Sequence, residues 1–238
     1  MSKRKKQRRR KAHLVEFVGL PTSGKTTIYK QIEADENLLS KYLIITPNTF
    51  SKLSTSTIYL NLPILILSNL RNIVFITYFC LVSCKWNRFN FYIYKHLIKM
   101  LLLTSFYKRR KHDFLLRECL IHFLTVLTFK DKIEKESVME TFLLKMEKQY
   151  AVFVYVDISE GDFYNRFIKR IKKDKKNYVN TLSKKQRSQF FENAYSNHLV
   201  LKKIVHKKIQ TPSIVLDGTK PPEENAVIAA RFIEKHVG

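Results

Sequence analysis

Residues 19–26, GLPTSGKT, constrain the fold of this chain more than any other segment. They match the pattern G-x-x-x-x-G-K-[ST], and they stand between an apolar run at 13–19 and a helical pattern at 25–36. Glycine is costly in ordered backbone and the chain contains only five, so two glycines five residues apart indicate a turn that other residues cannot form. Such a turn directs successive backbone N–H groups inward at the start of a helix, which predicts an anion-binding loop.

The side chains that follow the second glycine predict a site for a nucleoside triphosphate with a metal ion. The ammonium of Lys25 can reach the β- and γ-phosphates, and the hydroxyl of Thr26 can ligate Mg²⁺. The alternative is a glycine-rich turn with an exposed lysine. Glu16, inside the preceding apolar run, is more simply explained by a local ion pair than by a role in the site. The predicted nucleotide-binding residues are Gly19, Pro21, Thr22, Ser23, Gly24, Lys25, Thr26 and Thr27.

Apolar and helical segments alternate along most of the chain. Strands that alternate with helices favour a parallel sheet covered on both faces, so we expect an α/β fold with a five-stranded parallel sheet. Residues 48–111 predict a helical insertion between the second and third strands. The predicted strands are 13–19, 41–47, 113–118, 151–158 and 213–218. The predicted helices outside the insertion are 25–36, 135–148, 161–174, 183–208 and 221–237, the fourth of them starting at a Ser cap.

The chain is strongly basic, with 44 Lys and Arg against 20 Asp and Glu and a formal net charge of +24. Residues 3–11, KRKKQRRRK, supply eight of the positive charges, and the remaining chain is basic as well. A field of this sign attracts nucleic acid, anionic lipid or phosphorylated small molecules. We expect residues 1–12 to form a disordered, solvated tail that can make weak contacts with nucleic acid or anionic lipid, and residues 13–238 to form one domain.

Cysteine usage and hydropathy bear on location. Cys80, Cys84 and Cys119 show no disulfide-framework spacing, which indicates a reducing compartment, and we expect a cytoplasmic protein.

Residues 58–84 are apolar, but Arg71 and Asn72 split them into runs that are each shorter than the roughly 18 apolar residues of a membrane span. Packed helices are therefore favoured over a transmembrane helix, and nothing in the sequence indicates the oligomeric state.

Missing motifs exclude several classes of phosphate-loop protein. No Asp has Gly three residues on and no Asn is followed by Lys, so the motifs of a G domain are absent, as is an LSGGQ-like segment of ABC ATPases. Residues 16–27 instead resemble the phosphate loop of small-molecule and nucleotide kinases, the thymidylate-kinase and adenylate-kinase-like group. Residues 152–170, VFVYVDISEGDFYNRFIKR, are similar to the fourth strand and lid helix of that group, and residues 213–233 to its final strand, Asp-Gly turn and closing helix. The whole resemblance covers about 13–46 and 113–237.

The resemblance implies a three-layer P-loop NTPase fold and transfer of a phosphoryl group from ATP, with Mg²⁺, to a small acceptor such as a nucleoside or nucleotide. On this basis Lys25 and Thr26 hold ATP and Mg²⁺, and the acceptor sits over the carboxyl edge of the sheet, under residues 48–111. Arg166 and Arg170, four residues apart on one helix face, would be lid arginines that close on the transferring phosphate. The alternative for both arginines is an ordinary basic surface helix, because lysines stand beside them.

The sequence departs from the kinase pattern at the end of the third predicted strand. Arg117 occupies the position where the group places an Asp, and Glu118 follows it. In one interpretation Glu118 supplies the missing carboxylate, near either Mg²⁺ or the acceptor. In another the site has degenerated. A structural role for Glu118, a salt bridge at the start of a helix, is the remaining alternative. His122 is more simply explained as a histidine at the edge of the core. The predicted catalytic residues are thus Lys25, Glu118, Arg166 and Arg170, with Thr26 and Glu118 at the metal.

The departure at Arg117, the basic tail and the unmatched region 48–111 favour a second hypothesis. In it the chain is a catalytically weak, NTP-binding regulatory protein that docks on nucleic acid or anionic membrane through its basic surface. A carboxylate within reach of Thr26 would favour the kinase, and an arginine alone at that position would favour the regulatory protein.

Overall fold

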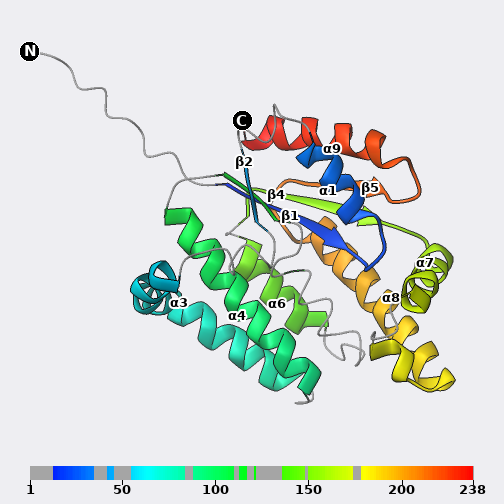
Figure 1. Cartoon of the computed structure of the whole chain (residues 1–238), viewed down its shortest axis with the longest axis horizontal. Coiled ribbons are helices and arrows are strands. Elements are labelled where there is room, and N and C mark those ends of the chain that lie inside the picture. Colours follow the sequence, from blue (N-terminus) through cyan, green and yellow to red (C-terminus); the bar gives the residue numbers. More distant parts are fainter. Residues whose placement is uncertain are drawn as a thin grey trace, which may run out of the picture.

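A five-stranded parallel sheet forms the centre of the molecule (Figure 1). The strands lie in the order β2-β3-β1-β4-β5, and each neighbouring pair is parallel. The predicted α/β class with parallel strands is confirmed. The computed structural model describes residues 13–34, 42–45, 55–83, 88–109, 113–116, 121, 136–147, 150–173 and 178–237. The strand bounds are β1 Leu14–Gly19, β2 Tyr42–Ile45, β3 Asp113–Leu116, β4 Val152–Asp157 and β5 Ser213–Asp217.

The central position of β1 determines where a ligand site can form. β2 and β3 lie on one side of β1 and β4 and β5 on the other, so the crossover connections diverge at its carboxyl end. All six residues of β1 and five of the six residues of β4 are buried, as expected for parallel strands that helices cover on both faces. The crevice that this topology creates therefore lies where β1 ends, at Gly19.

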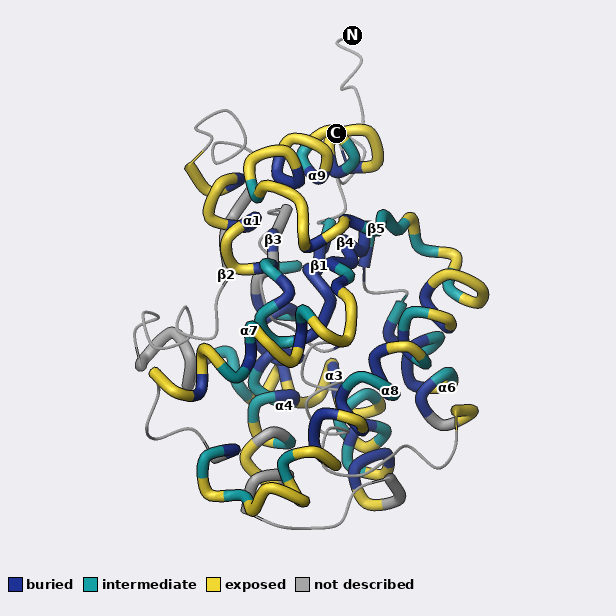
Figure 2. The backbone as a smooth tube through the Cα atoms, turned by 90° about the vertical axis from the view of Figure 1, so that its right-hand side faces the viewer, coloured by how far each residue is buried: buried dark blue, intermediate teal, exposed yellow. Residues whose placement is uncertain are grey.

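Helices cover both faces of the sheet. α1 and α9 lie on one face, and α3, α4, α6 and α8 lie on the other (Figure 1). Figure 2 shows β1 and β4 in dark blue between these layers, with the outward turns of α9 in yellow. The bounds on the first face are α1 Lys25–Glu33 and α9 Pro222–Val237. Those on the second face are α3 Thr55–Ser83, α4 Arg88–Arg109, α6 Glu136–Glu147 and α8 Lys184–Lys207.

The alternation of side chains along β1 connects the two layers. Leu14 and Val18 belong to the cluster that includes α3, α4, α6 and α8, whereas Val15 and Phe17 pack with α1 and α9. A third cluster lies beyond the carboxyl edge of the sheet, where α7 (Glu160–Lys173) packs on α8 and on the short 3₁₀ helix η2 (Tyr178–Thr181). This third cluster fixes α7 next to the end of β4.

The start of α8 follows the capping signal in the sequence. Ser183 Oγ accepts a hydrogen bond from the backbone N–H of Gln186 at 3.3 Å, and Gln186 Oε1 accepts one from the backbone N–H of Ser183 at 3.0 Å. This reciprocal capping box satisfies two N–H groups that a helix start otherwise leaves without partners. The predicted Ser cap is confirmed.

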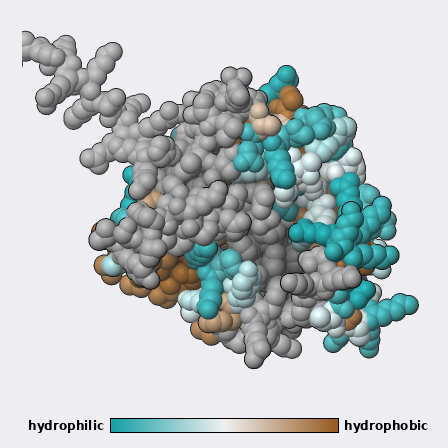
Figure 3. Space-filling model, in the orientation of Figure 1, coloured by the Kyte–Doolittle hydropathy of each residue, from teal (hydrophilic) through white to brown (hydrophobic). Residues whose placement is uncertain are grey.

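The helical insertion between β2 and β3 consists of α3 and α4, which pack against each other. A polar contact fixes them together: Ser105 Oγ on α4 donates to Asn69 Oδ1 on α3 at 2.9 Å, and the Asn69 amide donates to Leu65 O at 2.8 Å. Within α3, residues Asn61–Leu81 are long and apolar enough to cross a membrane by length and composition, with a mean hydropathy of 1.7. Figure 3 shows hydrophobic surface at its lower left, where Figure 1 draws α3.

Some of the sequence predictions concern residues outside the described part of the chain. These are the basic tail at 1–12, two of the three cysteines, and the third-strand positions Arg117, Glu118 and His122. Cys80 is described, and it is buried on α3.

Candidate phosphate-binding site

The loop between β1 and α1 needs its two glycines for different reasons. Gly19 has a φ of 145°, and a Cβ at this position would clash with the backbone carbonyl oxygen of Val156 on β4. Gly24 has a φ of 104° and forms the N-cap of α1, where its carbonyl accepts from the backbone N–H of Thr27 at 2.9 Å and of Ile28 at 3.0 Å. Close approach explains the first glycine, and a left-handed backbone conformation explains the second.

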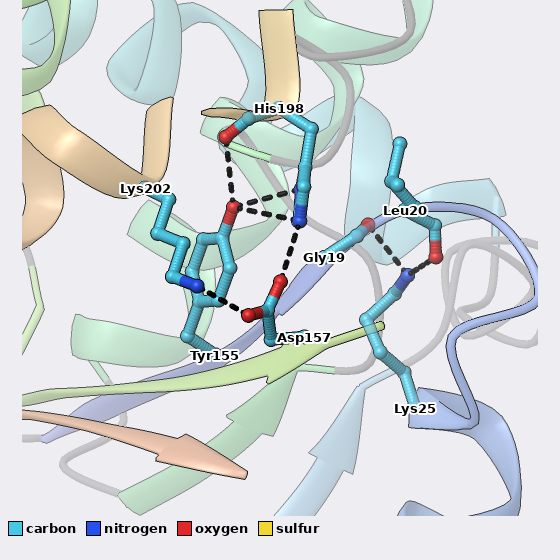
Figure 4. A network of polar contacts seen from close by, with 7 residues as sticks. All are labelled: Gly19, Leu20, Lys25, Tyr155, Asp157, His198 and Lys202. Atoms are coloured by element: carbon cyan, nitrogen blue, oxygen red, sulfur yellow. Dashed lines mark hydrogen bonds and ion pairs between the residues drawn. The ribbon is translucent and has the colours of Figure 1, made fainter. Parts of the chain in front are cut away.

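The side chain of Lys25 lies inside this loop. It is only 5% exposed, and its Nζ donates to the backbone carbonyl of Gly19 at 2.7 Å and of Leu20 at 2.6 Å (Figure 4). The alternative of a glycine-rich turn with an exposed lysine is therefore wrong. The loop holds a positive charge at the end of the central strand, where α1 also begins. α1 has no acidic residue in its first turn that would offset the positive end of the helix dipole.

Two hydroxyl groups of the loop suit an anion. Thr22 Oγ1 and Ser23 Oγ are buried and have no hydrogen-bond partner within the part of the chain that the structure describes. A buried polar group left without a partner costs about 1–3 kcal/mol. Thr22 also adopts a φ of 67°, a left-handed conformation that is uncommon for a non-glycine residue. Phosphate oxygens could accept from both hydroxyls, so the loop fits a phosphorylated ligand.

A cavity of about 340 Å³ adjoins the phosphate loop. It lies between the start of α1, the helix α7 and the turn that joins β5 to α9, with Gly24, Thr27 and Arg166 among its lining residues. Cavities of this size accommodate small organic ligands. Thr26 and Thr27 are exposed on the first turn of α1, at the edge between the loop and the solvent.

Gly218, in the turn after β5, ties this cavity to the loop. Its N–H donates to the carbonyl of Asp157 at 2.7 Å, and a Cβ at this position would clash with the carbonyl oxygen of Ser23. The preceding Asp217 accepts from the backbone N–H of Thr219 at 2.8 Å and from its hydroxyl at 2.6 Å, and these hydrogen bonds lower the pKa of Asp217. The Asp-Gly turn singled out in the sequence therefore packs directly on the phosphate loop.

The structure separates the two arginines that the sequence paired. Arg166 is partly buried, lines the cavity and donates from Nη1 to the carbonyl of Gly218 at 2.9 Å. Arg170 lies one turn further along α7, is exposed, and is not among the residues that line the cavity. Only the first of the two predicted lid arginines thus lies beside the loop in this structure.

A polar network that sequence reasoning missed stands next to Lys25 (Figure 4). Asp157 ends β4; its Oδ1 lies 3.1 Å from Nε2 of His198, and its Oδ2 forms an ion pair with Lys202. The hydroxyl of Tyr155 lies 2.8 Å from Nδ1 of the same histidine. These residues are about 40 positions apart in the chain, so only the packing of α8 on β4 brings them together.

Burial and charge shift the pKa values within this network. The hydrogen bond with His198 and the ion pair with Lys202 lower the pKa of Asp157 to about 2, although its partial burial opposes the shift. Burial lowers the pKa of His198, and the positive charges of Lys25 and Lys202 act in the same direction, against the raising effect of Asp157. Burial also raises the pKa of Tyr155. The site at neutral pH therefore contains an anionic Asp157 beside a neutral His198.

Glu16 has a structural contact that the sequence did not indicate. It is fully buried in β1, and its Oε1 accepts a hydrogen bond from the backbone N–H of Ile121 at 3.0 Å.

The predicted metal ligand Glu118 lies outside the described residues, and across the described ranges no group of three His, Cys, Asp or Glu side chains could hold a metal ion. Of the predicted metal ligands, the structure thus describes Thr26 alone.

Comparisons with known proteins bear on the fold. No protein-family model matches this chain, and no curated protein matches it. A deoxyadenosine kinase from M. mycoides, solved with the products dCMP and dCDP, superposes with a TM-score of 0.51 at 14% identity, over 93% of this chain and 99% of that one. This chain shares the fold of that deoxyadenosine kinase. The resemblance predicted from the sequence is confirmed at that level.

Two further solved structures are similar to this chain. The M. mycoides deoxyadenosine kinase with bound dATP gives a TM-score of 0.48 at 13% identity, over 94% of this chain and 100% of that one. An unliganded sugar kinase from Janibacter sp. HTCC2649 gives a TM-score of 0.44 at 13% identity, over 95% of this chain and 96% of that one. At identities this low, function has to be argued from the site.

Proposed function

We propose that this chain is an ATP-dependent kinase that transfers a phosphoryl group to a small acceptor, a nucleoside or a nucleotide. The observation that supports this most is the interior of the phosphate loop. There the buried ammonium of Lys25 lies at the end of the central strand, in the same loop as the buried hydroxyls of Thr22 and Ser23, which have no hydrogen-bond partner among the described residues. A cation and free donors in one loop suit a polyphosphate.

The residues around the loop have complementary tasks in this proposal. The loop N–H groups, the start of α1 and Lys25 hold the phosphates, which requires Lys25 to exchange its backbone carbonyl contacts for phosphate oxygens. The cavity of about 340 Å³ takes the nucleoside part of ATP. Arg166 borders that cavity and can add a bidentate contact to the phosphates, whereas Arg170 would have to move with α7 to do so.

A metal ion completes the chemistry of such a site. Mg²⁺, when bound, neutralises charge that develops on the phosphates. The hydroxyl of Thr26, on the first turn of α1, is suited to hold it. We propose Glu118 as the carboxylate that supports it, on the basis of its place at the end of the third strand in the sequence.

The acceptor is proposed to bind over the carboxyl edge of the sheet, on the side covered by α3 and α4. The M. mycoides neighbour makes deoxynucleosides and their monophosphates the first acceptors to test. The three cysteines lack disulfide-framework spacing, which suits a reducing compartment, so the enzyme is proposed to be cytoplasmic.

The test is transfer of labelled phosphate by the full chain. Protein, Mg²⁺ and γ-labelled ATP are incubated with deoxynucleosides, nucleoside monophosphates and sugars in turn. We expect one class of acceptor to become labelled, Lys25→Met to abolish labelling, and Lys30→Met, an exposed lysine on the same helix, to leave it unchanged. A chain that binds ATP but labels no acceptor in the panel would favour the regulatory NTP-binding protein instead.

A further inference from the structure

One side of α3 carries large apolar side chains that are more than half exposed to solvent. Nine of the thirteen exposed large hydrophobic residues that the structure describes lie on α3 and α4. Clusters of this kind mark interaction surfaces, because soluble proteins rarely leave large apolar areas in water. The residues that define this α3 face are Ile64, Leu67, Leu70, Val74, Tyr78 and Leu81, all between 52% and 72% exposed.

The spacing of these residues makes the surface continuous. Successive members stand three or four positions apart, so they form a stripe along one side of the helix. Phe91 and Tyr92, near the start of α4, are also exposed, at 45% and 56%. Hydrophobic atoms at the lower left of Figure 3 lie in the region of α3.

The opposite side of α3 belongs to the core. Leu65, Ile76 and Phe79 are buried in the cluster shared with α4 and α6, and Asn69 is bonded to Ser105 across the helix pair. The stretch Asn61–Leu81 is apolar enough to span a bilayer, yet 28% of it is buried in the protein. A spanning arrangement would remove these side chains from the core, so contact with a bilayer has to leave α3 lying in the plane of its surface.

The charges around the α3 face have one sign. Neither α3 nor α4 contains an Asp or Glu, and the whole sequence from 37 to 112 has none. Arg71 is exposed in the middle of the stripe, and Lys145 of α6 lies across a groove of about 500 Å³ with its Nζ 3.8 Å from the centre of the Phe75 ring. Burial and the nearby Arg71 lower the pKa of Lys145, as expected for two cations on one groove.

The carboxylates of α6 do not offset these cations. Glu136 pairs with Lys203 at 2.9 Å and Glu140 with Lys208 at 3.4 Å, both lysines of α8 or its end. The third carboxylate, Glu147, accepts a hydrogen bond from the backbone N–H of Gln210 at 3.0 Å. Among the described residues, no carboxylate forms an ion pair with Arg71 or Lys145. An apolar surface bordered only by positive charge is complementary to anionic lipid.

We propose that the α3 face docks on the surface of an anionic lipid bilayer, with its apolar stripe in the interface and Arg71 and Lys145 at the lipid phosphates. This inference goes beyond the proposed kinase activity and does not depend on it. A second copy of the chain fits the face less well. A two-fold interface would place Arg71, near the middle of the stripe, close to Arg71 of the other copy with no carboxylate on either helix. The basic sequence at residues 3–11 would add attraction of the same sign.

The experiment is co-sedimentation of the full chain with vesicles. One set is pure phosphatidylcholine and the other contains about one third phosphatidylglycerol. The test variant is Leu67→Glu with Val74→Glu, and the matched control is Leu199→Glu with Val227→Glu, exposed apolar residues of α8 and α9. All variants keep residues 3–11, so attraction through this tail is the same for each of them, and sedimentation is measured at a salt concentration of about 0.1 M, where attraction to anionic lipid is retained.

We expect the wild type and the control to sediment with the anionic vesicles and much less with the neutral ones. The face variant should lose at least about tenfold in partitioning, and Arg71→Gln about fivefold. Equal sedimentation of the face variant and the control would overturn the proposal, and so would equal binding to neutral vesicles. Light scattering that shows a wild-type dimer, split by the face variant while vesicle binding is unchanged, would assign the face to a second copy instead. Bound protein that alkaline carbonate fails to release would indicate a spanning helix.

Discussion

His198 Nε2 and Asp157 Oδ1 lie 3.1 Å apart at the carboxyl end of β4, one strand away from the phosphate loop. The contact ties the buried face of α8 to the strand that flanks β1, and Lys202 strengthens it through an ion pair with the same carboxylate. Gly19, which begins the loop, is paired in register with Val156, the residue before Asp157. The network therefore fixes the end of β4, which lies beside the loop that holds Lys25.

Protonation of His198 should make stability depend on pH. Burial lowers its pKa below the ordinary value of 6.5, so the unfolded chain gains a proton on this residue at a higher pH than the folded chain does. The free energy of unfolding should therefore fall as the pH is lowered through 6.5 and below, and stay level above it. Urea denaturation across that range measures the slope.

His198→Asn should flatten this slope, and His236→Asn, an exposed histidine on α9, serves as the control. A wild-type slope that persists in His198→Asn would show that another group governs the dependence.

Gly218→Ala should damage both stability and the site. The added methyl group would clash with the carbonyl oxygen of Ser23 in the phosphate loop, which is backbone and has little room to move. We expect a loss of about 1–3 kcal/mol in the free energy of unfolding. Gly161→Ala is the control, since nothing lies within 4 Å of its Cβ position, and it should be neutral or slightly stabilising. Equal denaturation midpoints for the two variants would contradict the close packing of the Gly218 turn on the loop.

Arg166 and Arg170 should differ in their effects on nucleotide affinity. Arg166 lines the cavity and bonds to the carbonyl of Gly218, whereas Arg170 is exposed. Arg166→Ala should weaken ATP binding about tenfold in a calorimetric titration, and Arg170→Ala by less than about twofold. The reverse order would indicate that α7 rotates when the nucleotide binds and that the second arginine is the working one.

Glu118 is predicted to support the metal. Glu118→Gln should remove Mg²⁺-dependent turnover and keep most metal-free nucleotide binding, since the loop itself supplies only Thr26 to the ion. Arg117→Asp should be neutral or activating. If Glu118→Gln is silent and only Arg117→Asp produces phosphoryl transfer, the natural protein is a nucleotide binder that has lost its catalytic carboxylate.

The parts of the site that the sequence predicts are those whose residues are neighbours in the chain. The phosphate loop is contiguous, so the spacing of Gly19, Gly24 and Lys25 was sufficient to predict a tight loop that leads into a helix, with the lysine at the helix start. The buried strands β1 and β4 are mostly apolar runs, and the N-cap Ser183 stands only three positions before its capping partner Gln186. Each of these features depends on residues that are close in the sequence, so the sequence alone predicts it.

The parts that the sequence does not predict depend on packing between distant segments. Asp157 and His198 are 41 positions apart, and no spacing rule connects them. Arg166 and Arg170 share a helix face, and only the placement of α7 decides that the first reaches the Gly218 turn. α3 is apolar on nearly all sides, so its sequence does not predict which side is buried. The packing of α4 and α6 against one side decides this.

Nucleotide-dependent stabilisation of the Lys25 variant tests the central claim most directly. The melting temperature of the wild type, Lys25→Ala and the control Lys30→Ala is measured with and without saturating ATP. The claim predicts an upward shift for the wild type and for Lys30→Ala, because a ligand that binds only the folded state stabilises it, and no shift for Lys25→Ala. An ATP-induced shift in Lys25→Ala as large as that of the wild type would contradict the assignment of this loop as the phosphate site.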